Sequence, residues 1–403
     1  MREIPGAWRR TAQGAGLLDA ADSPAPTIFA EMTGLALRTG AVNLGQGFPD
    51  EDGPAEVLAA AAAAIAAGEN QYAPGRGVPV LLQAVADHQR RFYGIELDPA
   101  REVLITAGAT EALAATLLAL IDSPDDEVVV FEPYYDSYAA CVALAGAKLV
   151  TVPLRWPDFQ PDPDDLAAAV GDRTRLILVN DPHNPTGAVF SAAVREQIVR
   201  LADRHDAVIV TDEVYEHLVF DGPHTPIATM PGAAARTLSI SSAGKTFSTT
   251  GWKIGWVTGS ADLVEAVLAV KQFLTYTNGT PFQHAIAAGL GLPDAYFDGA
   301  AATLRDKRDL LGEGLRAAGF AVSVAAGSYF TVADAADLMA PGTDAADFCR
   351  TLPERAGVVA IPLTAFASTE RRNQYASLVR FAACKRTEVI AEAGRRLAAL
   401  ADA

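Results

Sequence analysis

Three polar residues that stand just after short apolar segments could carry out chemistry together: Asn184, Asp212 and Lys245. The first two have adequate structural explanations, because Asn-Pro-Thr-Gly (184–187) is a good turn sequence and an aspartate after a strand often caps a helix. Lys245 is harder to explain in this way, since it lies in a segment of small residues where lysine is a poor choice for a tight turn. An amine of lowered pKa in such a place suits imine formation with a carbonyl group.

The apolar segments ahead of these residues predict the sheet that must position them. They are short, bounded by turn residues and separated by alanine-rich helical stretches, a pattern typical of βαβ units around a mostly parallel sheet. Open α/β sheets bind ligands beyond the carboxyl ends of their strands, which is where the three polar residues stand. Seven strands are predicted: Glu102–Thr106, Glu127–Phe131, Lys148–Val152, Arg175–Asn180, Ala207–Asp212, Arg236–Ser241 and Ile254–Gly259.

The length of 403 residues predicts more than one domain, because a single hydrophobic core rarely grows to that size. After about Leu292 the pattern changes to long amphipathic stretches such as Thr303–Ala318, with shorter strands at Tyr329–Ala333 and Ser377–Phe381. The glycine-rich segment Asn43–Pro49 suits a crossing between domains. We therefore predict an extended N-terminal arm without a packed element at 1–26, a small α+β domain at 27–50 and 293–403, and a large α/β domain at 51–292.

Composition and charge exclude several classes of function. A formal net charge of -17 would repel a nucleic-acid backbone or an anionic membrane, which favours small-molecule partners. The three cysteines are far apart and odd in number, so they predict neither a disulfide framework nor a metal site. The N-terminal segment lacks the apolar run of a secretory signal, and no stretch approaches the ~20 apolar residues that span a bilayer. We expect a cytoplasmic protein.

Four segments of the sequence together resemble those of a known family. They are residues 43–50, 184–187, 211–215, and 244–247 followed by 251–253, and their order and spacing are more specific than any one of them. From about Ile28 to Arg386 the chain resembles the fold-type-I, class I aminotransferases, in the branch of kynurenine/glutamine and succinyldiaminopimelate aminotransferases. The resemblance implies a seven-stranded mostly parallel sheet in a large domain, pyridoxal 5′-phosphate as cofactor, and transamination between an L-amino acid and a 2-oxo acid.

The resemblance also implies roles for individual residues. Lys245 would hold the cofactor as an imine and, once released, move the proton between the substrate and the cofactor. Asp212 would keep the pyridine nitrogen protonated, so that the ring can accept electrons. Asn184 and Tyr215 would bind the phenolic oxygen of the cofactor, and Tyr135 would stack on its ring.

A second group would bind the two anions of the reacting complex. Ser242 and Lys253 would hold the phosphate together with Ala109 and Thr110, which begin a helix whose free N–H groups favour an anion. Tyr72 is similar to a tyrosine that reaches the phosphate from the neighbouring subunit, which implies a homodimer with shared active sites. Further along, Arg380 would bind the substrate α-carboxylate in bidentate fashion through its planar guanidinium group, at an end of the site lined by Gly47.

The side-chain end of the substrate site is predicted to be apolar. The segment 271–280, expected near that end, contains no arginine, so an acidic side chain would lack a cationic partner there. This favours neutral, aromatic or sulfur-containing side chains, and N-succinyldiaminopimelate only if a cation arrives from the N-terminal arm. Phe273, Tyr276, Asn278, Phe29 and Tyr135 are candidates for the lining, and Arg9 and Arg10 for the cation.

One alternative function stays open, and two others are disfavoured by the sequence. A carbon–sulfur β-lyase acting on cysteine conjugates would use the same lysine, aspartate and arginine. A non-catalytic cofactor-sensing module would need a DNA-binding domain, for which 26 residues ahead of the match are too few. A Rossmann dehydrogenase is poorly supported, because no Gly-x-Gly-x-x-Gly follows a first strand. Two features depart from the family pattern, namely Asp181 where a small neutral residue is expected, and the arm before Thr27.

Overall fold

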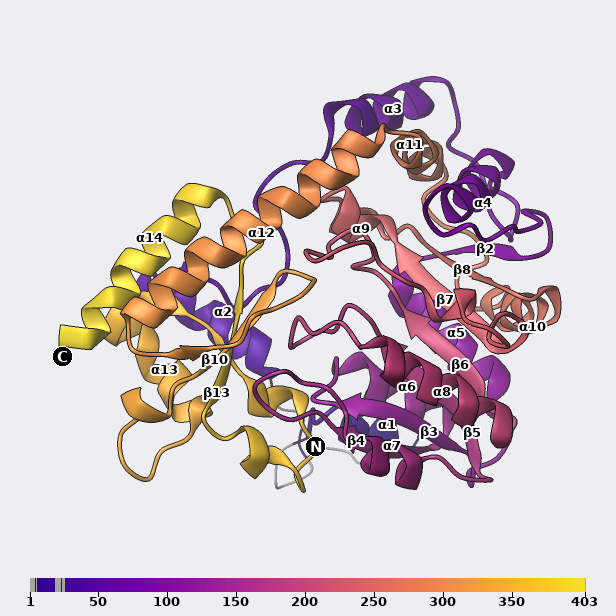
Figure 1. Ribbon diagram of the computed structural model, residues 1–403. Coiled ribbons are helices and arrows are strands. Elements are labelled where there is room, and N and C mark those ends of the chain that lie inside the picture. Colours follow the sequence, from indigo (N-terminus) through magenta and orange to yellow (C-terminus); the bar gives the residue numbers. More distant parts are fainter. Residues whose placement is uncertain (1–3, 5, 19–22, 24–25, 403) are drawn as a thin grey trace.

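A seven-stranded sheet forms the centre of the molecule (Figure 1). The computed structural model describes residues 4, 6–18, 23 and 26–402. Every strand predicted for this sheet is present, with ends shifted by a residue or two. In spatial order the strands are β2 (Val103–Thr106), β8 (Gly255–Gly259), β7 (Thr237–Ser242), β6 (Val208–Asp212), β5 (Thr174–Asn180), β3 (Glu127–Glu132) and β4 (Lys148–Pro153).

The sheet is mixed, and one strand runs against the rest. β7, β6, β5, β3 and β4 are parallel to one another, whereas β8 pairs antiparallel with both β7 and β2. The beginning of β8 therefore lies at the edge where β2 and β7 end. The prediction of a mostly parallel seven-stranded sheet is confirmed.

Alternate residues of each strand pack against helices on opposite faces. In β5, Leu176 and Leu178 belong to one buried cluster, and Ile177 and Val179 belong to another. Such two-sided burial explains why these strands are continuous apolar runs in the sequence. The first cluster, which contains Leu176 and Leu178, includes side chains of α5 (Gly108–Leu120), α6 (Ser137–Ala145) and α10 (Ala261–Lys271). The second cluster, which contains Ile177 and Val179, includes side chains of α7 (Pro163–Ala169) and α8 (Ala192–Arg204).

A third cluster covers the end of the sheet at β2 and β8. There Val103, Ile105 and Trp256 pack with three helices that lie side by side at the top right of Figure 1. These are α3 (Ala55–Ala66), α4 (Pro79–Tyr93) and α11 (Thr280–Leu290).

The C-terminal part forms a second, antiparallel sheet with helices on one side. Its strand order is β12 (Ile361–Pro362), β13 (Leu378–Ala382), β10 (Phe330–Asp334) and β9 (Ala321–Val322). The helices are α2 (Ile28–Thr39), α12 (Asp294–Ala317), α13 (Ala345–Ala356) and α14 (Thr387–Ala398). β1 (Val42–Asn43) pairs in parallel with β11 (Val358–Val359), so the segment near residue 42 lies with the C-terminal strands. The limits of the two domains remain a prediction.

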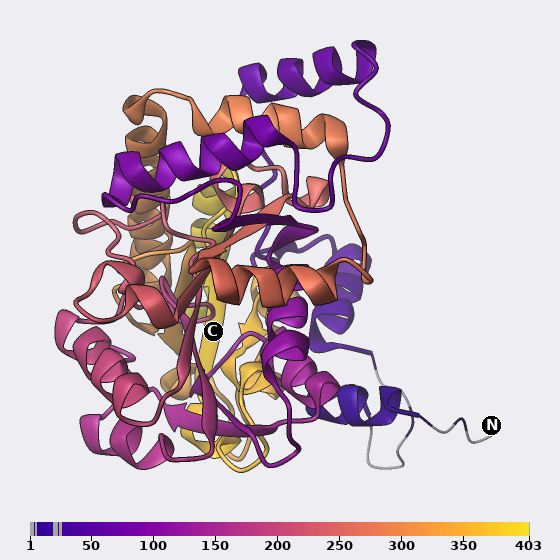
Figure 2. The same cartoon turned by 90° about the vertical axis from the view of Figure 1, so that its right-hand side faces the viewer.

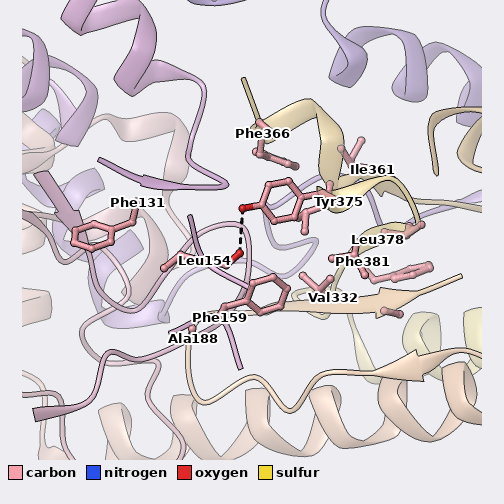
Figure 3. Packing of buried hydrophobic residues seen from close by; sticks show 14 of the residues in the cluster. Phe131, Leu154, Phe159, Ala188, Val332, Ile361, Phe366, Tyr375, Leu378 and Phe381 are labelled. Carbon is pink, nitrogen blue, oxygen red and sulfur yellow. Dashed lines mark hydrogen bonds between the residues drawn. The ribbon is translucent and has the colours of Figure 1, made fainter. Parts of the chain in front are cut away.

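The second buried cluster also joins the two parts of the molecule. It contains Phe131 and Phe159 from the seven-stranded part, and Val332 and Phe381 from the C-terminal sheet (Figure 3). At this junction the hydroxyl of Tyr375, which is 1% exposed, donates to the carbonyls of Glu132 at 2.7 Å and Leu154 at 3.0 Å.

The N-terminal arm differs from its prediction in one respect. It contains a helix, α1 (Trp8–Gly14), which lies against α6 (Figure 2). The contact is close because Gly14 has no side chain: a Cβ there would stand 2.7 Å from Ala143 Cβ. Arg10 Nε donates to Ala143 O at 2.8 Å. The prediction of no packed element was wrong because a helix of only seven residues shows too little periodicity to detect.

Candidate active site

A cavity of about 410 Å³ opens at the carboxyl ends of the central strands. Most of the residues selected from the sequence line it, although they come from segments far apart in the chain. The predicted residues along its wall are Gly47, Ala109, Thr110, Tyr135, Asn184, Asp212, Tyr215, Ser242, Lys245, Lys253 and Arg380. Their individual roles are treated below as proposals.

The register of the strands explains this convergence. Asn180 is paired with Asp212 across β5 and β6, and Asn180 Nδ2 donates to the Asp212 carbonyl at 2.8 Å. The Asn180 side chain also accepts from the Asn184 N–H at 2.7 Å, which holds the loop after β5 at the strand end. Ser242 ends β7 opposite Gly255, so the antiparallel β8 brings Lys253, two residues before Gly255, to the same edge.

Lys245 lies in the short helix α9 (Ala243–Thr246) and points its amine into a buried region. Its Nζ donates to Tyr329 Oη at 2.8 Å and to Gly47 O at 3.3 Å. Burial lowers the pKa of Lys245 from 10.5 to about 8, although the nearby Cys384 and Asp212 act in the opposite direction. The neutral fraction of this amine near physiological pH is therefore larger than that of an ordinary lysine, and imine formation requires the neutral amine.

Asp212 is buried at the end of β6 and has one unused oxygen. Its Oδ2 accepts a hydrogen bond from Tyr138 Oη at 2.7 Å, whereas Oδ1 is buried without a hydrogen-bond partner among the described residues. Burial raises the pKa of Asp212 to about 6, against the lowering effect of Tyr138. A buried carboxylate oxygen of this kind is costly unless a donor arrives, and a protonated pyridine nitrogen is such a donor.

The N-terminus of α5 and Lys253 form a site suited to an anion. Gly255 allows close approach of the chain, since a Cβ there would lie 2.6 Å from the Gly108 carbonyl carbon. Lys253 Nζ donates to Thr110 Oγ1 at 3.2 Å. A helix N-terminus, a hydroxyl and an ammonium group together match the requirements of a phosphate.

Arg380 is a buried cation in β13. Its guanidinium donates to Asn184 Oδ1 at 3.1 Å and to Gly45 O at 2.7 Å, and its Nε is buried without a partner among the described residues. Its central carbon also lies 4.1 Å from the ring centre of Phe330 and 4.5 Å from that of Phe366. Among the described residues no carboxylate lies within ion-pair distance of Arg380, so the guanidinium can receive one from a substrate.

Gly47 lines the cavity, but its small size serves the packing as well. A Cβ at this position would lie 2.6 Å from Phe330 Cζ and 3.2 Å from Tyr329 Cε2. The sequence suggested that a side chain here would obstruct the substrate. In the structure it would first collide with two aromatic rings of the C-terminal part.

Several predicted residues do not reach the cavity of the single chain. Tyr72 is 85% exposed and packs edge-on against Tyr276 with ring centres 5.8 Å apart. Phe273 is 87% exposed, and Asn278 instead donates to the Lys253 carbonyl at 2.9 Å. The predicted aromatic lining is therefore supplied within one chain by Phe29 and Tyr135, together with Phe48, Phe330 and Phe366.

The arginines of the arm do not reach the cavity either. Arg10 is bound to α6, as described above, and the guanidinium of Arg9 lies 5.0 Å from the ring centre of Trp8. In a single chain, neither supplies the cation that was considered for a succinylated substrate.

Two residues that contact the predicted catalytic groups were missed from the sequence. Tyr138 bonds Asp212, and its position three residues after Tyr135, on the first turn of α6, was an available signal. Tyr329 bonds Lys245 from the C-terminal part, 84 residues away, and no local pattern indicates that contact.

The unexpected Asp181 has a structural role in the loop after β5. Its carboxylate accepts from the Phe190 N–H at 3.3 Å and lies 3.3 Å from Arg195 Nη1. Burial raises the pKa of Asp181, and Arg195 and His224 partly offset this effect. The carboxylate therefore ties the loop to the start of α8 instead of facing the cavity.

A group of potential metal ligands lies outside the cavity wall: His88, Glu216 and His217 have ligand atoms within 4.8 Å of one another. His88 Nε2 and His217 Nε2 are hydrogen-bonded to each other at 2.7 Å, and Glu216 accepts from Tyr93 Oη at 2.6 Å. The two histidines are thus bonded to each other, and Glu216 to the hydroxyls of Tyr93 and Ser241, so each side chain has a hydrogen-bond partner within the protein.

The donor set fits pyridoxal 5′-phosphate, and comparison with known proteins agrees. An anion site, an unpaired buried carboxylate oxygen and a lysine amine of lowered pKa face one cavity. Residues 39–397 match the family of class I and II aminotransferases, and the chain belongs to that family. It is a pyridoxal-phosphate-dependent aminotransferase of fold type I.

Individual relatives cover nearly the whole chain. A probable N-succinyldiaminopimelate aminotransferase, DapC, from Mycobacterium tuberculosis (strain ATCC 25618 / H37Rv) is 50% identical over 94% of this chain and 97% of that protein. The solved structure of N-succinyldiaminopimelate aminotransferase from Mycobacterium tuberculosis has a TM-score of 0.89 with 51% identity, over 93% of this chain and 97% of that one. A methionine aminotransferase of Escherichia coli (strain K12) is 36% identical over 92% of this chain and 95% of that protein.

Among the residues that the structure describes, the helices are all too short or too polar to cross a membrane.

Proposed function

We propose that this enzyme transfers the amino group of N-succinyldiaminopimelate, or forms that compound from its oxo acid, with a second amino acid and oxo acid completing the cycle. The observation that carries the proposal is the 50% identity to the DapC protein over 94% of this chain, against 36% for the methionine aminotransferase. The distal carboxylates of such a substrate need a cation, and the cations that line the cavity of one chain, Lys245, Lys253 and Arg380, have other proposed partners. That cation would have to come from the partner subunit.

A second candidate is an amino acid with a long neutral, aromatic or sulfur-containing side chain, such as methionine, glutamine or kynurenine. The aromatic wall formed by Phe29, Phe48, Phe330 and Phe366 favours it. Transfer from aspartate is disfavoured for the same reason, because its second carboxylate would be desolvated without a partner at a cost of several kcal/mol.

When bound, the cofactor supplies an electron sink that makes the substrate Cα acidic. Lys245 would anchor it and, once free, would take and return the Cα proton. Asp212 would keep the pyridine nitrogen charged through its unpaired Oδ1, while Tyr138 donates to the other oxygen. Asn184 and Tyr215 would bind the phenolic oxygen of the cofactor, and Tyr135 would stack on its ring.

Anion binding orients both reactants. The cofactor phosphate would be held at the start of α5 by Ser242, Lys253, Ala109 and Thr110. Arg380 binds the substrate α-carboxylate in place of solvent. Because Arg380 also donates to Asn184 Oδ1, at 3.1 Å, it couples the carboxylate site to the cofactor site.

The exposed aromatic surface around Tyr72 supports the proposal of a homodimer with shared sites. Tyr72, Phe273 and Tyr276 are 85%, 87% and 40% exposed, which is unusual for large apolar side chains on a monomer. The partner would cover this surface, and Tyr72 would reach the partner's phosphate site. Three free, buried cysteines accord with a reducing compartment, and we place the enzyme in the cytoplasm.

Steady-state kinetics with five amino donors test the substrate. We expect the highest kcat/KM with N-succinyldiaminopimelate, lower values with methionine, glutamine and kynurenine, and the lowest value with aspartate. A parallel measurement of pyruvate and ammonia released from a cysteine conjugate tests the β-lyase alternative. Aspartate as the best donor, or β-elimination faster than transfer to any 2-oxo acid, would contradict the proposal.

A further inference from the structure

Tyr329 lies where the C-terminal part meets the proposed catalytic lysine. It immediately precedes β10 and is 2% exposed. Its hydroxyl contacts Lys245 Nζ at 2.8 Å and is also hydrogen-bonded to the Gly47 carbonyl. Its ring packs edge-on against that of Tyr215, with centres 5.2 Å apart. The residue therefore joins three segments that surround the amine.

The direction of these hydrogen bonds is determined by the groups involved. A carbonyl only accepts, so the one proton of the Tyr329 hydroxyl is donated to Gly47 O. Towards Lys245 the Tyr329 oxygen can then only accept. Lys245 therefore donates one N–H to Tyr329 and another to Gly47 O, at 3.3 Å.

A neutral amine has two N–H groups and one lone pair. When both N–H groups are donated to Tyr329 and Gly47, the lone pair is left without a hydrogen bond. An amine held in this way is ready to attack a carbonyl or to accept a proton, which are the two tasks that the proposed function gives Lys245.

We propose that Tyr329 is a positioning residue for Lys245, and that its hydroxyl and the Gly47 carbonyl form a resting site for the free amine whenever the lysine is not bonded to the cofactor. This rests on the proposed role of Lys245. The resting site is assembled from both parts of the molecule: Lys245 belongs to the seven-stranded part, and Tyr329 to the C-terminal part.

Removing the acceptor should change the proton affinity of the amine. In Tyr329→Phe the charged form of Lys245 loses a hydrogen-bond partner that stabilises it, so its pKa in the cofactor-free protein should fall below about 8, by about one pH unit. The measurement is the rate of reductive methylation of the Lys245 peptide against pH, quantified by mass spectrometry. Lys148, which is half exposed on the surface, serves as an internal reference in every sample.

Tyr375→Phe is the matched control, because it also removes a buried tyrosine hydroxyl that donates to backbone carbonyls, but at the junction shown in Figure 3. It should leave the Lys245 titration as in the unmodified protein. If Tyr329→Phe does not fold, 3-fluorotyrosine at position 329 keeps the ring and weakens the oxygen as an acceptor, and a smaller fall in the same direction is expected.

An unchanged Lys245 titration in folded Tyr329→Phe protein, or an equal change in Tyr375→Phe, would overturn the proposal. The test uses neither substrate nor cofactor. The resting site could therefore fail while transamination is measured normally, and the substrate proposal could fail while the titration shifts as expected.

Discussion

At the scale of single residues, the site depends on charges that burial makes unfavourable. Lys245 and Asp212 both have pKa values moved towards their neutral forms, to about 8 and about 6, with desolvation as the largest cause in each case. Each group therefore costs stability in the cofactor-free protein when it is charged. The cofactor supplies partners for both, so its binding and folding are coupled.

Lys245→Met should separate catalysis from stability. We expect no multiple-turnover transamination, together with a cofactor-free protein that is more stable than the unsubstituted one by at most about 3 kcal/mol below pH 8. The sign follows from the lowered pKa: between pH 8 and 10.5 the unfolded chain binds more protons at Lys245 than the folded chain does, so the unsubstituted protein gains stability as the pH rises. The difference between the two proteins should therefore vanish above pH 10.5.

Urea unfolding of the two cofactor-free proteins across that pH range measures the difference. A variant that retains substantial turnover would refute the role of Lys245. A stability difference that grows with pH would instead refute the lowered pKa.

At the scale of elements, the least expected feature is the docking of α1 on α6. α6 begins just after Tyr135 and contains Tyr138, which holds Asp212, so the outer face of a helix at the active site carries the N-terminal arm. Two observations support the docking: the close approach at Gly14 and the 2.8 Å hydrogen bond from Arg10 Nε to Ala143 O.

Gly14→Ala tests this contact. The added Cβ would stand 2.7 Å from Ala143 Cβ and 2.9 Å from Ala139 O, so α1 must shift, at a cost of about 1–3 kcal/mol. Trypsin should then cleave after Arg9 and Arg10 faster than in the unsubstituted protein. Gly299→Ala in α12 is the control, since nothing lies within 4 Å of its Cβ position and alanine favours a helix. Equal cleavage rates for Gly14→Ala and the unsubstituted protein would show that α1 is not held by this contact.

At the scale of the whole molecule, the single chain brings together the cavity but leaves the Tyr72 surface uncovered. The exposed aromatic side chains there come from the α3–α4 connection and from the segment between α10 and α11. Lys271, which is 1% exposed, donates to Gly75 O at 2.8 Å and also to the Tyr276 carbonyl, and so holds these two segments together. A surface that is both apolar and rigidly held suits a permanent interface.

Tyr72→Phe should leave a dimer intact and weaken cofactor binding, because only the hydroxyl that would reach the partner's phosphate is lost. A hydrogen bond to a charged group of about 1.5–3 kcal/mol corresponds to at least a tenfold rise in the Kd of the cofactor. Sedimentation measures the assembly and equilibrium titration measures the Kd, with Tyr375→Phe as the control at a buried site. An active monomer, or an unchanged Kd in Tyr72→Phe, would contradict shared sites.

The sequence by itself determined the central sheet and the polar residues of the cavity wall to which roles are assigned. Each strand is a short apolar run buried between two layers, and several predicted polar residues stand at a strand end or a few positions beyond it, so local pattern and chain order suffice to predict them. Asn184, Asp212 and Lys245 are of this kind. Their roles remain proposals that the geometry supports.

Only the tertiary structure decided which groups surround those residues. The contact of Tyr329 with Lys245 joins two parts of the molecule that are 84 residues apart, and the docking of α1 depends on a single missing Cβ. The same holds for the pKa values of Lys245 and Asp212, because desolvation depends on every segment packed around a group. The tertiary structure also decided that Tyr72 and Phe273 lie on the surface and not in the cavity of their own chain. Only packing determines which aromatic side chains remain exposed.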